Sequence, residues 1–210
     1  MIQVYGRDSS ANVQAVMWCV AELGLEHERL DVGGSFGGTD TAEYRALNPM
    51  GLVPVLKDGG KVLWESPTIV RYLMKAYGDH PQDAFAAAQI EQWADWTRSH
   101  FYPQVVVGVF YQLYRMTAEQ RNHGAVAAAC AEMKHLGAIV SKAIKGPYFM
   151  GDRLTLADYA FGTLMHRYFV MEFDRGDFPV LRAYYDALCD RPAYRAQVMK
   201  DPNVLKVPGA

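Results

Sequence analysis

The sequence predicts a small α/β domain in residues 1–77 that is joined to an all-helical domain in residues 84–210. Apolar residues alternate between strand-like and helix-like spacing up to Tyr77, and no convincing strand pattern follows the linker Gly78–Pro81. The chain has 210 residues, of which 50% are hydrophobic, so it can bury a sizeable core without disulfides.

The first domain is expected to run β-α-β-α-β-β-α. Its strands and helices are, in order, Ile2–Tyr5, a helix through Val13–Leu23, His27–Val32, Thr41–Leu47, Leu52–Leu56, Lys61–Trp64 and a helix that begins at Ser66-Pro67. A helix joins the first two strands, so they should be parallel with a right-handed crossover. The residues Asp58-Gly59-Gly60 predict a hairpin between the last two. One mixed four-stranded sheet covered by helices follows.

The second domain is expected to contain helices only. Ala84–Arg115 is a long helical stretch in which Pro103 predicts a kink. Thr117 and Gln120 match a capping box and predict the start of the next helix, which should end near Lys145. Further helices are predicted over Leu154–Val170, over Pro179–Cys189 and after Pro192.

Charge and composition exclude several functions. The net charge is −2 and neither domain has a strong basic surplus, which disfavours nucleic-acid binding and docking on anionic membranes. The six histidines show no paired ligand spacing, so we predict no metal site. The three cysteines lie far apart and predict no disulfide framework. No secretory signal is visible and the most apolar stretch, Val105–Phe110, is too short to span a bilayer, so a cytoplasmic location is expected.

The segment Ser9-Ser10-Ala11-Asn12 lies between the first strand and the first helix. Hydroxyl groups at a helix start lie beside unpaired N–H groups and the positive end of the helix dipole, where a thiolate is stabilised. The alternative is that Ser10 or Asn12 is only an N-cap, because Ser and Asn are among the preferred capping residues.

Two further features belong to the same domain. The proline in Val53-Pro54 cannot donate to a strand ladder, so it marks either an ordinary edge strand or a cis bond. A cis bond would leave the backbone of Val53 free to pair with an extended peptide. The hydroxyl and amides at Ser66 can hold a carboxylate and Glu65 can hold an ammonium, which together match the zwitterionic end of an amino acid. The alternative at this position is helix capping.

These residues carry a resemblance to the glutathione S-transferase family, in particular to bacterial members with a serine-type site that are theta-like or beta-like. The matching pieces are Ser10-Ala11-Asn12, Leu47–Leu56, Trp64-Glu65-Ser66 with Ile69–Leu73 after it, and Gly151–Asp158. The last piece resembles the family's capping box and hydrophobic staple, in which Thr155 caps and Asp158 reaches back. The resemblance implies a thioredoxin-like N-terminal domain, a helical C-terminal domain and a homodimer.

The resemblance also implies roles for single residues. Val53 before a cis Pro54 would pair with the cysteinyl unit of glutathione, the co-substrate, while Glu65 and Ser66 would hold its γ-glutamyl end. Ser10 would donate its hydroxyl to the sulfur, and Asn12 could assist or replace it. The thiolate would then attack a small hydrophobic electrophile.

The helical domain should supply the electrophile pocket. The candidate residues are aromatic and belong to one long helical stretch: Tyr102, Phe110, Tyr111 and Tyr114. For each of them the alternative is core packing or a dimer contact.

The sequence departs from the family at two points of the site. At the first, Met50 and Gly51 stand where many relatives have a basic or histidine residue, which leaves the group that holds the glycyl carboxylate open. The second lies at the first helix. Asn12-Val13 stands where serine-type relatives often have Pro-Cys, and Ser10 stands where bacterial cysteine-type relatives have cysteine, so disulfide exchange is disfavoured.

Two other functions stay open. One is a glutathione-dependent isomerase that resembles maleylacetoacetate isomerase, and the other is a glutathione-binding module without catalysis.

Overall fold

Two units make up the structure, a computed structural model that describes residues 1–210. The first unit comprises Met1–Gln82 and Pro192–Lys200, and the second comprises Asp83–Arg191 and Asp201–Ala210. The sequence-based division placed residues 192–200 with the helical domain. In the structure, helix α9 (Pro192–Gln197) packs on α1 (Ala11–Glu22), where the rings of Tyr194 and Trp18 meet edge to face with centroids 4.9 Å apart. Both rings are fully buried, so α9 extends the core of the first unit.

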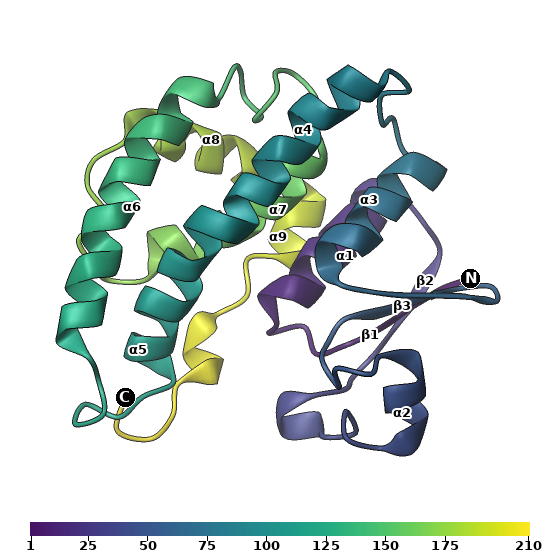
Figure 1. The fold of residues 1–210 in the computed structure, drawn as a ribbon, viewed down its shortest axis with the longest axis horizontal. Coiled ribbons are helices and arrows are strands. Elements are labelled where there is room, and N and C mark those ends of the chain that lie inside the picture. The colour runs from purple at the N-terminus through teal and green to yellow at the C-terminus, as the bar shows by residue number, and fades with distance from the viewer. The chain divides into compact units, whose positions relative to one another are not determined.

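The sheet of the first unit contains four strands in the order β2-β1-β3-β4. The strands are β1 (Ile2–Tyr5), β2 (His27–Leu30), β3 (Val55–Asp58) and β4 (Lys61–Trp64). β1 pairs with β2 in parallel and with β3 in antiparallel register, and β3 forms a hairpin with β4. Helices α1 and α3 (Ser66–Tyr77) lie on one face of the sheet and α2 (Ala42–Leu47) lies on the other (Figure 1). The predicted thioredoxin-like arrangement of a mixed sheet with helices on both faces is confirmed.

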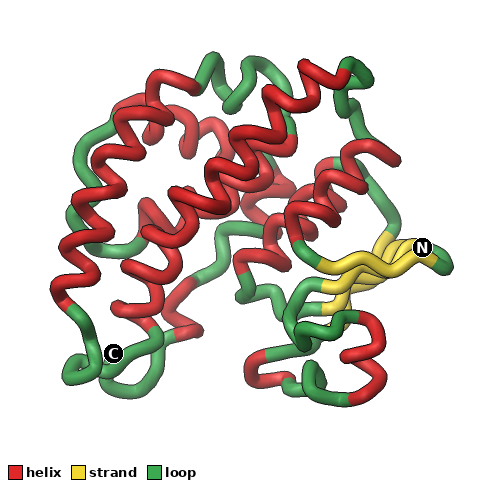
Figure 2. The backbone as a smooth tube through the Cα atoms, viewed as in Figure 1, coloured by secondary structure: helices red, strands yellow, loops and turns green.

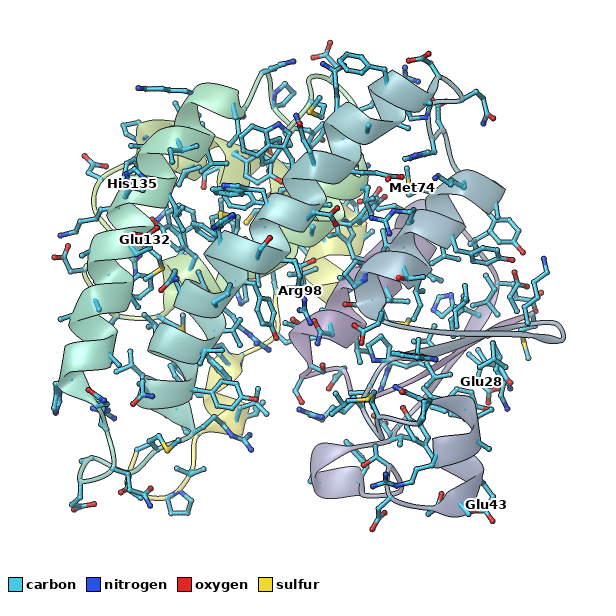
Figure 3. The ribbon with its side chains drawn as sticks, viewed as in Figure 1. Glu28, Glu43, Met74, Arg98, Glu132 and His135 are labelled. Carbon is cyan, nitrogen blue, oxygen red and sulfur yellow. The ribbon has the colours of Figure 1, made fainter.

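Apolar side chains from α1 and α3 form the core above the sheet. Nearly every residue from Ala11 to Val20 is buried, and α3 buries Ile69, Val70, Leu73 and Met74, which are spaced three and four apart (Figure 3 labels Met74). Removing this surface from water supplies the main stabilisation of the unit.

The strand expected over Leu52–Leu56 begins only at Val55. The Val53-Pro54 peptide bond is cis, and the carbonyl of Leu52 accepts hydrogen bonds from two side chains rather than from a neighbouring strand. The chain therefore turns before Pro54 and joins the sheet after it.

The second unit is built from helices (Figure 2). Its elements are α4 (Ala84–Trp96), the π-helical segments η2 (Thr97–Phe101) and η3 (Pro103–Tyr111), α5 (Gln112–Tyr114), α6 (His123–Ala143), α7 (Leu156–Val170), α8 (Pro179–Cys189) and the short 3₁₀ turn η4 (Pro202–Leu205). α7 is buried over most of its length, whereas α6 buries Met133 and leaves Glu132 and His135 exposed (Figure 3). No helix is long and apolar enough to cross a membrane.

Pro103 is the first residue of the second π-helical segment, η3, and does not end the helical stretch. Because proline has no N–H, it cannot make the usual bond to the fourth residue before it. The chain continues to wind there with the wider turns of a π-helix, which is a rare conformation in α-helices.

The start predicted for the next helix is wrong. α6 begins at His123, and the Asn122 side chain caps it by accepting a hydrogen bond from the amide of Ala125 at 2.9 Å. The amide of Thr117 does donate to the Gln120 side chain at 3.2 Å, but this pair closes only a turn. Asn122 has an extended backbone and is as strong a capping residue as threonine, so the helix starts after it.

Asp58 at the end of β3 links the sheet to α3. Its carboxylate accepts hydrogen bonds from the hydroxyls of Tyr72, at 2.6 Å, and of Tyr77. These two bonds, Tyr72 first, lower the pKa of Asp58 below its usual value. A lowered folded-state pKa gives stabilisation that is present above the usual pKa and is lost as pH falls through the lowered one.

We therefore expect the stability advantage of the native chain over Asp58→Asn to shrink on acidification between about pH 5 and pH 2. Urea unfolding of both proteins across this range measures that difference. An advantage that grows as pH falls would contradict the assignment.

Candidate functional site

The starts of α1 and α3 meet in the first unit. The Ser66 hydroxyl, in the first turn of α3, donates to Oδ1 of Asn12, in the first turn of α1, at 3.3 Å. Ser66 is buried and Asn12 is half-buried. The first N–H groups of a helix have no partner within it and carry partial positive charge, so two such ends side by side form a region suited to anionic groups.

Ser10 is the residue before α1, and its side chain makes no capping hydrogen bond. The loop that holds it is fixed by other contacts: the Gln14 side chain donates to the Asp8 carbonyl at 2.8 Å, and the Ser10 amide donates to the Arg7 carbonyl at 3.2 Å. Gln14 is buried, so the donor end of the first of these bonds is shielded from water. Ser10 thus occupies the N-cap position of α1, but its hydroxyl does not make the capping hydrogen bond.

Val53 and the cis Pro54 lie close to the same helix. Gly6, the residue after β1, marks the close approach: a Cβ there would lie 2.4 Å from Val13 of α1 and 3.2 Å from Val53. Gly6 has φ of +153° and any side chain would force these elements apart. The missing side chain therefore allows Val53 to approach the helix that Ser10 and Asn12 begin. Of the two alternatives for Val53-Pro54, the structure shows the cis bond.

Two residues that were not assigned a role shape the turn before Val53. The Tyr44 hydroxyl and the Asn48 amide both donate to the Leu52 carbonyl, at 2.9 Å and 2.8 Å. Asn48 also accepts from the Met50 amide at 3.0 Å. Burial raises the pKa of Tyr44 to about 12, so its hydroxyl stays protonated and keeps donating. The signal in the sequence was Asn48-Pro49, because asparagine favours turns in which its side chain bonds to the backbone two residues on.

Glu65 adopts an unusual backbone conformation, with φ of 70° and ψ of 111°. It is the one non-glycine residue with positive φ, a conformation that costs free energy and is often found at functional sites. The Glu65 side chain is exposed, and the next residue is the buried Ser66. The Glu65 carboxylate is thus held in solvent, and the amides beside it at the start of α3 can bind the carboxylate of a ligand.

The structure brings three of the four candidate aromatic residues of the second unit together. Phe110 and Tyr114 are buried and stacked with centroids 5.1 Å apart, and Tyr111, 47% exposed, meets Phe110 edge to face. Tyr102 lies apart, with the Arg98 guanidinium 4.3 Å above its ring (Figure 3 labels Arg98). The contacts of Phe110 are therefore largely those of a side chain packed in the core.

Tyr114 also lines a cavity of about 550 Å³ within the second unit, together with Arg121, Val170, Glu172 and Lys206. Lys206 lies 5.0 Å from the centre of the Tyr114 ring. Burial raises the pKa of the Tyr114 hydroxyl, and the nearby carboxylates Asp201 and Glu172 act in the same direction. The hydroxyl therefore stays protonated at neutral pH and can donate a hydrogen bond.

Comparison with known proteins identifies the family. The family model described as the N-terminal domain of glutathione S-transferase matches residues 9–76, and that of the C-terminal domain matches residues 105–192. The chain belongs to the glutathione S-transferase family. Among curated relatives, this transferase is 35% identical to glutathione S-transferase GstB of Escherichia coli K12, over 95% of the chain and 98% of that protein. It is 30% identical to glutathione S-transferase 3 of Zea mays, over 96% and 95%.

Solved structures agree. A theta class glutathione S-transferase from Xanthomonas axonopodis pv. citri, solved with glutathione bound, matches with a TM-score of 0.88 and 39% identity, over 96% of this transferase and 98% of that chain. The match to the two domain models includes Ser10, Val53, Glu65 and Ser66 in the first and Phe110 to Tyr114 in the second. The resemblance read from the sequence is confirmed.

Proposed function

We propose that this transferase binds glutathione in its first unit and conjugates it to small hydrophobic electrophiles. Val53 pairs its backbone with the cysteinyl unit, and Glu65 and Ser66 hold the ammonium and carboxylate of the γ-glutamyl end. Ser10 donates its hydroxyl to the sulfur, and Asn12 supports it. The observation that carries the proposal is the 3.3 Å bond between Ser66 and Asn12, because it joins the part that would hold the carboxylate to the part that would hold the sulfur.

The chemistry needs no protein base. Glutathione loses its thiol proton to water, and the hydrogen bond from Ser10 together with the N-terminal end of α1 stabilises the thiolate that remains. The sulfur lone pair then forms a carbon–sulfur bond. In a substitution the leaving group departs with the electron pair of the bond that breaks, and in an addition the carbanion that forms takes a proton from solvent. The protein accelerates the step by keeping a larger fraction of the thiol ionised and by orienting it.

The second unit supplies the walls for the electrophile in this proposal, from Tyr102, Phe110, Tyr111 and Tyr114. Stacked aromatic rings and a protonated tyrosine hydroxyl suit an apolar molecule that carries one polar acceptor. Turnover of maleylacetoacetate in place of conjugation would favour the isomerase, and binding of glutathione without any turnover would favour the binding module.

We also propose a homodimer. Large apolar side chains of the first unit are exposed in the loop before Pro54 and on the edge strand β4: Met50, Leu52, Val62 and Trp64, with exposed fractions between 37% and 60%. Exposed apolar groups of this size favour an interface with another chain. Light scattering during size-exclusion chromatography measures the mass directly.

Two substitutions at Glu65 test the glutathione site. Glu65→Ala and Glu65→Gly both remove the carboxylate, and each should weaken glutathione binding about tenfold or more as judged by isothermal titration calorimetry. Glycine adopts the positive φ without strain, whereas alanine keeps the strain of the native residue. The unfolding free energy of Glu65→Gly should therefore equal that of the native chain, and the unfolding free energy of Glu65→Ala should be no higher than that of the native chain.

The matched control is Glu43→Ala, which removes an exposed carboxylate from α2 (Figure 3). It should leave glutathione binding unchanged. Unaltered affinity in both Glu65 variants would remove Glu65 from the proposed site.

A further inference from the structure

A second cavity of about 310 Å³ lies at the end of α7, under the loop that leads to α8. Its walls include the rings of Tyr168, Phe169 and Phe178 and the guanidinium groups of Arg175 and Arg182. None of these residues has a role in the proposed glutathione site. The volume falls at the lower end of the range for small-molecule sites.

The loop that carries Arg175 is held in place from several sides. The Phe178 ring fills the space over Gly137 of α6, where a Cβ would lie 2.6 Å from the ring. The Lys134 ammonium pairs with Asp174, and the Tyr168 hydroxyl donates to the Arg175 carbonyl at 3.1 Å. The Arg175 guanidinium itself donates to the Met171 carbonyl. The loop thus fixes an arginine side chain that would otherwise lose much conformational entropy on binding a ligand.

Two positive charges face this cavity. The Arg182 guanidinium lies 4.1 Å from the centre of the Phe169 ring, and that of Arg175 lies 4.9 Å from the Phe173 ring and 6.0 Å from the Phe169 ring. Nε of Arg175 is buried and has no hydrogen-bond partner. A buried donor without an acceptor costs free energy, so Arg175 is held at a cost that its packing among the aromatic rings must offset.

The nearby carboxylates do not neutralise the pair. Asp177 lines the cavity but is exposed, and Asp186 meets Arg182 at 3.7 Å with both side chains more than half exposed. Surface ion pairs of this kind contribute little free energy, so Asp186 does not hold the Arg182 guanidinium firmly. Burial lowers the pKa of Arg175, and the Arg182 charge acts in the same direction. The Arg175 guanidinium still keeps its charge at neutral pH, because arginine does not deprotonate in proteins.

We propose that this cavity binds the carboxylate of a small organic acid with a planar, apolar body. The carboxylate lies between the two guanidinium groups and accepts from both, as planar guanidinium groups favour. The body of the acid packs among the edges of the aromatic rings. The Arg182 guanidinium lies over the Phe169 ring and meets Asp186 only at 3.7 Å at the surface, so a ligand carboxylate competes with a weak ion pair for its N–H groups.

Benzoate is the probe, and it is tested on the full chain by thermal unfolding. At ten times its dissociation constant, benzoate should raise the melting temperature by roughly 3–6 °C. Benzamide has the same shape without the charge and should give no shift. Inorganic phosphate has the charge without the apolar body and should bind more weakly than benzoate.

Arginine variants locate the binding. Arg182→Met and Arg175→Met should each reduce the affinity for benzoate at least tenfold, whereas Arg115→Met, at an exposed arginine outside the cavity, should not. Arg182 is more than half exposed, so its variant should fold even if Arg175→Met does not. Equal shifts by benzoate in the native chain and in Arg182→Met would overturn the proposal, as would equal shifts by benzamide and benzoate or no shift at all.

Discussion

Replacing Ser10 by alanine is expected to lower kcat/KM for glutathione conjugation by about 30- to 150-fold, which corresponds to about 2–3 kcal/mol of transition-state stabilisation. The reason is that the thiolate loses a hydroxyl donor placed at the start of α1, where the side chain makes no competing capping bond. The pKa of the bound thiol should rise, while glutathione affinity should fall only modestly because Val53, Glu65 and Ser66 remain. Stopped-flow or steady-state assays across pH measure both effects.

Two controls separate Ser10 from its neighbours. Ser9→Ala removes an adjacent hydroxyl and should leave turnover nearly unchanged. Asn12→Ala should have a smaller effect than Ser10→Ala, because Asn12 already accepts from Ser66. If Ser10→Ala keeps the native rate and Asn12→Ala abolishes it, Asn12 is the group that contacts the sulfur.

Replacing Asp158 by alanine is expected to lower the unfolding free energy by about 3–5 kcal/mol. Asp158 is fully buried in the first turn of α7. One carboxylate oxygen accepts from the Phe149 amide at 2.7 Å and the Tyr184 hydroxyl at 3.1 Å, and the other accepts from the amide and hydroxyl of Thr155 at 2.8 and 3.0 Å. Alanine leaves these donors without an acceptor. Urea unfolding at neutral pH measures the loss.

The control for Asp158 is Asp152→Ala, an exposed carboxylate in the loop before α7, which should change stability by no more than about 0.5 kcal/mol. The pH dependence has a defined sign as well. Burial raises the pKa of Asp158, so its contribution to stability is greatest in acid and falls as pH rises through the raised value. A loss below about 1 kcal/mol for Asp158→Ala would show that the buried network is not stabilising.

Most of the fold follows from local patterns in the sequence. The apolar residues of α1 and α3 recur three and four apart, and Asp58-Gly59-Gly60 specifies a hairpin turn, so the elements of the first unit were predictable. The capping box at Thr155 and Asp158 was predictable too, because its residue types and spacing are specific. The box at Thr117 and Gln120 failed because a better placed cap, Asn122, competes with it.

Other features depend on contacts between distant segments. α9 packs against Trp18, more than 170 positions away in the chain, and no local pattern contains that information. The roles of Tyr44 and Asn48 also depend on the position of the Leu52 carbonyl, which the fold determines. The residue types at Ser10, Val53, Glu65 and Ser66 indicated a site, but their nearness depends on a glycine at position 6 and on the contact between α1 and α3.

The central proposal is that this transferase binds glutathione and holds its sulfur in the ionised form beside Ser10. Titration of the ultraviolet absorbance of the glutathione thiolate, with and without a molar excess of the protein at millimolar concentration, tests it directly. We expect the thiol of bound glutathione to ionise at a pH at least about one unit below that of the free tripeptide. Superimposable titration curves would contradict the proposal.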